Sequence, residues 1–263
     1  MFLSKPKTPD VVTIPINGCI SASESKRSAE GINPDKFNRL LESVDLSQCQ
    51  LVIIDINSGG GSPVGSSMIH DRILELRNDF PVIAHCRDIC ASGAYMIASA
   101  CNCIYAHKSS IIGSIGVITS HFGLDRFIAK HDIDYREFTA GKSKGFLNPF
   151  KPVDAEKEEL IKGLLEDCHQ EFIDIVYGSR KLDRMNENKE EIITAKVFSG
   201  AKACEIGLID GFKNPTEIID QFTEGDINHT VIEDKESWLK KLFGFNINVK
   251  LEDLEKLEQF MRF

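Results

Sequence analysis

The sequence lacks an excess of positive charge and any long apolar run. Its net charge of -9 disfavours nucleic acid as the main partner, because phosphate binding requires a basic face. No segment, the first ten residues included, is apolar for long enough to form a signal peptide or a membrane span. We therefore expect a soluble, cytoplasmic chain whose membrane association is at most peripheral.

The eight cysteines also lack the spacing of a zinc site, and a disulfide framework is expected in short secreted chains rather than in one of this length without a signal. Cys101 and Cys103 are separated by a single residue, and no matching pair follows them. Most cysteines lie inside apolar stretches. The sequence predicts buried, reduced thiols, no bound metal and no cofactor.

What the sequence does contain is an apolar fraction of 42%, enough to build a core. Short apolar runs alternate with segments of helical spacing, which predicts parallel βαβ crossovers. The expected strands are 11–21, 51–57, 81–86, 103–106 and 113–119. The expected helices are 34–44, 65–78 and 154–179, the last capped by Asp154.

Two regions differ from this alternation. Residues 181–191 are polar and charged, and we expect a loop there. From Thr223 the composition changes, so we expect one domain over 1–222 and a C-terminal appendage over 223–263, used for oligomerisation. Within the appendage, SWLKKLFGF could pack on the core or a neighbouring subunit, or lie at a membrane surface.

A glycine-rich turn, NSGGGS, follows the second expected strand over residues 57–62. Such a turn can expose a row of backbone amides that binds an anion or an oxyanion. It does not match a phosphate loop or a dinucleotide motif. Alone, it is equally consistent with a plain tight turn.

Ser92 follows the third expected strand and begins a short apolar helix. At a helix N-terminus the dipole stabilises a nucleophile and the oxyanion that it generates. A helix cap is the commoner use of serine at this position, and this stretch alone favours the cap.

A serine nucleophile also needs a base. His107 and His121 lie downstream, but neither has a surrounding pattern that distinguishes it. Lys142 and Lys144, in TAGKSKGFLNPF, precede an apolar segment that could bury one of them. Burial is required, because a lysine serves as a base only when its pKa falls toward neutrality.

Four segments occur in order: DINSGGGS, ICASGAYMIASACNCIYAHKSSIIGSIGVI, GKSKGFLNPFKPV and VFSGAKACEIGLIDGF. Together they resemble the signal peptide peptidase A family of serine peptidases, SohB-like members included, over about residues 11–222. The resemblance implies an α/β, ClpP/crotonase-like fold of stacked ββα and βαβ units with a helical C-terminal appendage. It also implies hydrolysis of peptides, such as signal-peptide remnants, by a Ser-Lys dyad.

By this resemblance Ser92 matches the nucleophile and Lys144 the general base. Ser114 matches the serine that orients the lysine, and Lys142 is expected to be an exposed bystander. In short, single-domain members the base can come from a neighbouring protomer, so a homo-oligomer is expected. Activity should rise with pH, because the base must be neutral.

The resemblance assigns the oxyanion hole to the backbone amides of Gly61 and Gly93, with Gly60 shaping the turn. Gly59 stands where the family usually has proline, which leaves the turn looser. Three other functions stay open at this point. They are a Ser-His peptidase of the Clp type, a crotonase-like acyl-CoA enzyme and an inactive scaffold.

Overall fold

The structure is a computed structural model that describes residues 8–23, 31–141, 143–180 and 183–232. Its centre is a sheet with the strand order β6-β5-β3-β2-β1-β7, in which β4 also pairs with β3. All pairs are parallel except that of β5 with β6. The strands are β1 Val11–Ile20, β2 Leu51–Gly61, β3 Val82–Ala91, β4 Cys103–Ala106, β5 Ile111–Gly113, β6 Val197–Ser199 and β7 His229–Val231.

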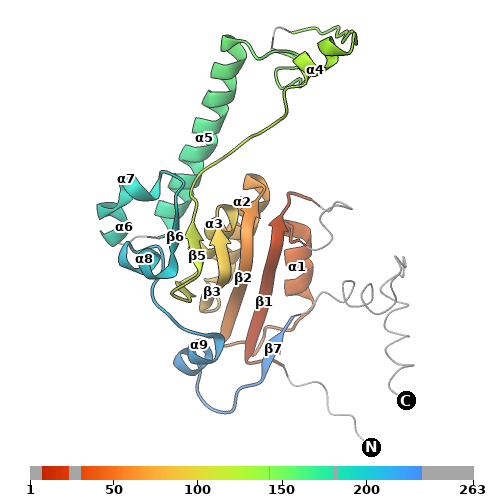
Figure 1. Cartoon of the computed structure of the whole chain (residues 1–263). Helices are drawn as coiled ribbons and strands as arrows, with labels where there is room; N and C mark the ends of the chain where they lie inside the picture. Colours follow the sequence, from red (N-terminus) through yellow and green to blue (C-terminus); the bar gives the residue numbers. More distant parts are fainter. Residues whose placement is uncertain (1–7, 24–30, 142, 181–182, 233–263) are drawn as a thin grey trace, which may run out of the picture.

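Helices cover the two faces of this sheet unequally (Figure 1). The main core lies on the face packed by α1, α2, α3 and the C-terminal half of α5, while α9 covers one end of the opposite face through Ile218. The helices are α1 Pro34–Glu42, α2 Pro63–Leu76, α3 Gly93–Ser99, α4 Asp125–Lys130, α5 Ala155–Ser179, α6 Asp183–Glu187, α7 Lys189–Ile192, α8 Gly200–Glu205 and α9 Pro215–Phe222.

The period of two along each strand explains why both faces are apolar. On β2, Val52, Ile54 and Ile56 belong to the main core, whereas Leu51 and Ile53 pack with Ile218 on the other side. A strand buried on both faces reads as a continuous apolar run. The predicted α/β fold with parallel crossovers is therefore confirmed. The C-terminal ends of its parallel strands lie at the same end of the sheet.

The long helix is also confirmed. α5 begins after Asp154, whose carboxylate accepts a hydrogen bond from the Lys157 amide at 2.9 Å.

Two predictions of local structure are wrong. The chain leaves the sheet after Gly113, so the strand expected over 113–119 ends there. The loop expected over 181–191 contains α6 and α7, which are anchored by the buried side chains of Met185 and Ile192.

Residues 117–154, of which all but 142 are described, form an arm that carries α4 away from the sheet alongside the start of α5 (Figure 1). Several of its apolar side chains are almost fully exposed. They include Ile118 at 87%, Phe122 at 85% and Phe138 at 95%. Such a concentration of exposed aromatic and aliphatic groups is typical of a surface that contacts a partner.

The sheet does not end at the domain boundary expected after residue 222. β7 follows this boundary and pairs with β1, so the sheet continues into the expected appendage. Most of the expected appendage, including SWLKKLFGF, lies outside the described residues. Within the described part of the chain, no helix has the length and apolar content needed to cross a bilayer.

The cysteines are all free thiols, as predicted, but only some of them are buried. Cys86, Cys90 and Cys101 lie in the core, whereas Cys19 and Cys168 are exposed. Burial raises the pKa of the Cys90 and Cys101 thiols, so these two are unreactive as nucleophiles.

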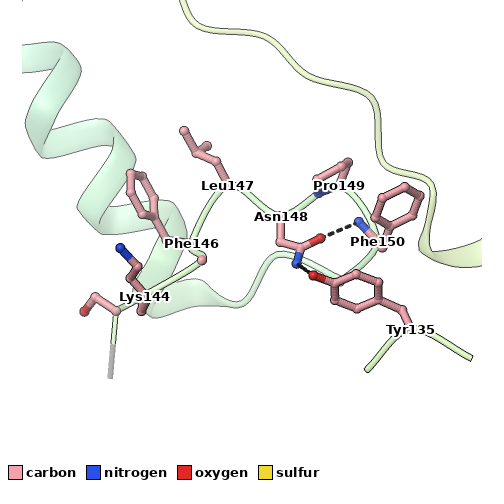
Figure 2. Close-up of a pocket in the computed structure, with 9 residues that line it drawn as sticks. Tyr135, Lys144, Phe146, Leu147, Asn148, Pro149 and Phe150 are labelled. Atoms are coloured by element: carbon pink, nitrogen blue, oxygen red, sulfur yellow. Dashed lines mark hydrogen bonds between the residues drawn. The ribbon is translucent and has the colours of Figure 1, made fainter. Parts of the chain in front are cut away.

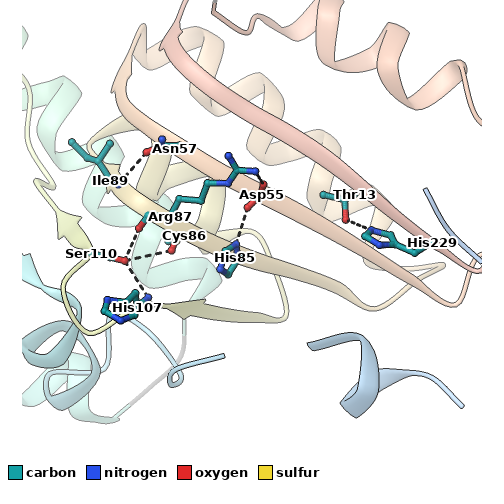
Figure 3. A network of polar contacts seen from close by, with 10 residues as sticks. All are labelled: Thr13, Asp55, Asn57, His85, Cys86, Arg87, Ile89, His107, Ser110 and His229. Atoms are coloured by element: carbon teal, nitrogen blue, oxygen red, sulfur yellow. Dashed lines mark hydrogen bonds and ion pairs between the residues drawn. The ribbon is translucent and has the colours of Figure 1, made fainter. Parts of the chain in front are cut away.

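A charged cluster sits on the sheet face opposite the main core (Figure 3). The buried Asp55 carboxylate accepts hydrogen bonds from His85 Nδ1 at 2.7 Å and from Arg87 Nη2 at 2.5 Å. Burial acts to raise the pKa of Asp55, but its bonds to His85 and Arg87 outweigh burial and hold the pKa below its usual value. The ionised form is therefore favoured by folding, and it stabilises the fold above the unfolded pKa of about 3.9.

We expect Asp55→Asn to lower the free energy of unfolding at neutral pH by roughly 1.5–3 kcal/mol, the typical contribution of a hydrogen bond to a charged group. The difference from wild type should shrink as the pH falls through the lowered pKa of Asp55, where the wild-type carboxylate becomes protonated. Urea unfolding at several pH values measures it. Asp71→Asn is the matched control, because Asp71 also bonds a histidine but its side chain is 70% exposed; an equal loss in both variants would contradict the prediction.

Candidate active site

Ser92 lies at the junction between β3 and α3 in a strained backbone conformation. Its φ is 53° and its ψ is -130°, and it occupies the N-cap position of α3. The hydroxyl makes no capping hydrogen bond. Non-glycine residues with positive φ cost about 1–3 kcal/mol and concentrate at functional sites. The position is that of a cap, but the side chain does not act as one.

Ser114 lies beside Ser92, at the end of the neighbouring strand. The Ser92 amide donates to the Gly113 carbonyl at 2.8 Å, and Ala91 pairs with Gly113 in the sheet. Ser114 also has a positive φ, 55°, and its amide donates to the Lys196 carbonyl at 2.8 Å. Two of the predicted site serines are thus held side by side by main-chain bonds, each in a conformation that serine rarely adopts.

The end of β2 approaches this junction so closely that it requires glycine. Gly60 has a φ of 96°, and a Cβ atom there would lie 2.7 Å from the Gly93 amide nitrogen and 2.9 Å from Ser92 Cβ. A Cβ on Gly93 would lie 3.5 Å from the Gly61 nitrogen. The predicted oxyanion-hole glycines are therefore neighbours around Ser92, and the first amides of a helix have no acceptor inside the helix.

The Gly60 amide itself is not an oxyanion donor in this arrangement. It donates to the Ser58 hydroxyl at 3.1 Å, inside the protein. The Gly60 amide is thus already engaged, which leaves the amides of Gly61 and Gly93 as the pair beside Ser92.

Lys144 lies in the arm, away from the other predicted residues. It is exposed and lines a pocket of about 530 Å³ together with Phe146, Leu147 and Phe150 (Figure 2). No hydrogen bond joins it to Ser92 or Ser114 among the described residues. Within one chain the structure therefore assembles the serines and glycines but not the lysine. Lys142 lies outside the described residues.

Glu137 organises the loop that carries Lys144. Its carboxylate accepts hydrogen bonds from Lys151 at 2.8 Å, from Tyr135 at 3.0 Å and from the Asn148 amide group. The bond to Lys151, followed by those to Asn148 and Tyr135, lowers the pKa of Glu137, so the network is intact at neutral pH. This loop is built as a unit, although it packs on nothing near Ser92.

Neither histidine considered as an alternative base reaches Ser92. His107 Nδ1 accepts a hydrogen bond from the Ser109 amide at 3.2 Å, and His121 is exposed in the arm. A nearer histidine, which the sequence did not indicate, is His169 on α5. Its Nε2 donates to the Ile115 carbonyl at 3.0 Å, one residue beyond Ser114.

A separate Ser-His-Asp set joins α2 to α5. His70 Nε2 bonds the Ser179 hydroxyl at 2.8 Å, and its Nδ1 bonds Asp71 at 3.1 Å. Burial lowers the pKa of His70, which keeps the ring neutral. Ser179, however, ends α5, where the helix dipole is negative and opposes an oxyanion. We interpret this set as a structural link between helices.

Ser66 is a further residue that the sequence did not single out. It is fully buried on α2, and its hydroxyl donates to the Ser62 carbonyl at 2.8 Å. A Cβ on Gly93 would lie only 2.2 Å from this hydroxyl oxygen. A buried serine on a helix looks like a surface serine in sequence, so only the packing identifies it.

The arrangement defines an α/β protein with a strained serine and paired backbone amides at a strand-to-helix turn. Comparison with known proteins gives its family: residues 75–227 match the sequence model of Peptidase family S49, and the chain belongs to that family. The signal peptide peptidase A resemblance seen in the sequence is thereby confirmed.

Two relatives and one solved structure illustrate the similarity. A Na(+)/H(+) antiporter NhaA of Brucella abortus is 36% identical over 202 residues, which are 76% of this chain and 24% of that protein. The chloroplastic serine protease SPPA of Arabidopsis thaliana is 31% identical over 206 residues, 76% of this chain and 30% of that protein. The chain thus spans under a third of either relative.

The solved structure is that of the 1510-N membrane-bound stomatin-specific protease, a lysine-to-alanine variant in complex with a substrate peptide. It superposes with a TM-score of 0.54 at 17% identity, over 89% of this chain and 96% of that chain. At this identity the match supports the fold alone, and it agrees with the predicted architecture.

The strain at Ser92 gives the first prediction about the site. Ser92→Gly should raise the free energy of unfolding by about 1 kcal/mol, since glycine adopts positive φ without strain and offsets only part of that gain by its greater unfolded-state entropy. Ser92→Ala keeps the strained backbone and serves as the control. Thermal unfolding of both variants measures the difference; equal melting temperatures would contradict the strain.

The close contact between Gly93 and Ser66 gives the second prediction about the site. Gly93→Ala should destabilise the fold by about 1–3 kcal/mol, because its Cβ collides with the Ser66 hydroxyl. In the double variant with Ser66→Ala, the nearest remaining Ser66 atom would be Cβ at 3.1 Å, so part of the loss should be recovered. A double-mutant cycle of unfolding free energies measures the coupling. Strict additivity would show that the two residues do not touch.

Proposed function

We propose that this chain is a serine peptidase that cleaves peptides or unfolded segments, signal-peptide remnants among them, with Ser92 as nucleophile. The observation that carries the proposal is the strained backbone of Ser92 at the N-terminus of α3, next to the amides of Gly61 and Gly93. The Ser92 hydroxyl makes no capping hydrogen bond to the helix. Two aligned amides stabilise the oxyanion of a tetrahedral intermediate, and losing one such donor costs about 3–4 kcal/mol in characterised hydrolases.

Lys144 is the proposed base, and it reaches Ser92 from a neighbouring copy of the chain. Three features support this: Lys144 stands on an arm remote from its own Ser92, the arm exposes large apolar side chains, and Glu137 holds the loop in one shape. Docking of the arm on a second copy would bury the lysine, the condition under which it can accept a proton.

In this mechanism Lys144 accepts the Ser92 proton as the hydroxyl attacks the scissile carbonyl, and then gives that proton to the leaving amine. Ser114 hydrogen-bonds the lysine and orients it. Water then attacks the acyl-enzyme ester, with Lys144 again taking the proton, and releases Ser92 and the new carboxyl terminus. Activity should rise with pH as the base loses its charge.

Mixing two inactive variants tests the proposal. Ser92→Ala and Lys144→Ala should each lose activity on a fluorogenic peptide library by roughly 10⁴-fold or more, while Lys142→Ala stays active. Subunits of the two dead variants, unfolded and refolded together in equal amounts, should regain activity in about one quarter of their sites if each site combines two subunits in a cyclic assembly.

The other outcomes are equally informative. A mixture that stays inactive beside an active wild type would place the lysine in the same subunit as its serine. An active Lys144→Ala would replace the lysine with a different base, such as a histidine. A wild type that cleaves nothing and resists a fluorophosphonate probe would overturn the peptidase proposal.

A further inference from the structure

Ser58 lies inside the protein at the point where the sheet becomes irregular, and it is only 1% exposed. The pairing of β1 with β2 shifts register between Asn17 and Cys19, and that of β2 with β3 shifts between Ile56 and Ser58. Register shifts of this kind leave main-chain groups without their ladder partners. The Gly60 amide is buried here, so it needs a partner of another kind, whereas Gly18 on β1 is exposed.

The Ser58 hydroxyl supplies this partner and also bonds a main-chain group of β1. It donates to the Gly18 carbonyl of β1 at 2.5 Å and accepts from the Gly60 amide at 3.1 Å. A serine hydroxyl has one donor and two acceptor positions, so one oxygen can make both bonds. The side chain therefore ties the bulge of β1 to the glycine turn of β2.

The turn needs such a hydrogen-bonded connection because its own residues allow many backbone conformations. Residues Gly59–Gly61 are three successive glycines, the residues with the widest backbone freedom. Gly60 is held at a φ of 96°, against the Gly93 amide and Ser92 Cβ. Fixing the Gly60 amide, together with these close contacts at Gly60, restricts the orientation of the following peptide, which carries the Gly61 amide.

We propose that Ser58 is a positioning residue that sets the direction of the Gly61 amide in the oxyanion hole. It touches neither substrate nor nucleophile, and it acts through Gly60. The inference rests on the proposed peptidase function. It predicts that the Ser58 hydroxyl matters more in the transition state than in substrate binding, since an oxyanion exists only after attack.

The test compares Ser58→Ala with Ser110→Ala. Ser110 is 2% exposed, and its hydroxyl likewise donates to a main-chain carbonyl, that of Arg87 at 2.5 Å, and accepts from an amide, that of His107 at 3.1 Å (Figure 3). Both variants should lose similar stability. Only Ser58→Ala should lower kcat, on the order of 10- to 100-fold with little change in KM.

Two further readouts separate positioning from mere stability. A peptide boronate that mimics the tetrahedral intermediate should lose affinity for Ser58→Ala in proportion to the fall in kcat/KM, and amide hydrogen exchange at Gly60 should speed up. If Ser58→Ala folds poorly, Ser58→Cys keeps a weak donor of similar size and should show an intermediate kcat.

Wild-type kcat in Ser58→Ala, or a rise in KM alone, would overturn the assignment while leaving the peptidase proposal intact. An equal fall of kcat in Ser110→Ala would also overturn it, because general loosening would then explain both variants. An inactive wild type would instead refute the proposed function itself, so the two failures are distinguishable.

Discussion

The close approach of β2 to the β3–α3 junction is the constraint on which the candidate site depends. Side chains are excluded at Gly60 and Gly93 because their Cβ atoms would overlap a backbone nitrogen and the Ser66 hydroxyl. Backbone amides therefore occupy the space where side chains would normally lie. Of the three residues 91–93 that form the turn, only Ser92 carries a functional group, and its strained φ lies between a buried strand and a buried helix.

Strain of this kind persists only when the surroundings over-determine it. Here β3 is bonded on both sides, and every residue of α3 is buried. Tyr95 anchors the helix from within, since its fully buried hydroxyl donates to the Leu208 carbonyl at 2.7 Å. Burial raises the pKa of this phenol far above its usual value, so the hydroxyl keeps its proton and its hydrogen bond at neutral pH. The core thus holds Ser92 in a conformation that the local sequence would not choose.

The sequence could predict the parts of the fold that depend on periodicity. Continuous apolar runs identified β2 and β3, and the helical spacing after Asp154 identified α5. It failed where tertiary contacts decide. Residues 114–119 are rich in residues typical of strands, yet they leave the sheet, and residues 181–191 look polar although Met185 and Ile192 bury two short helical turns.

For the site, spacing alone favoured a cap at Ser92, and only the ordered set of four segments favoured a nucleophile. Ser58 and Ser66 could not be found from the sequence. Each is a small polar residue in a stretch that contains other serines, and their roles arise from strands and helices brought together by the fold.

The division of the candidate site between a rigid body and an exposed arm has a consequence for the proposed mechanism. The serines and amides are prearranged in each chain by the sheet, whereas the proposed base is carried on a loop that Glu137 shapes independently of them. A lysine accepts a proton only in its neutral form, which burial favours. On this mechanism an isolated chain holds a complete oxyanion hole beside a serine that lacks a base. Assembly would then bury the apolar arm and bring the base to Ser92 in the same step, so that hydrolysis is confined to the assembled form.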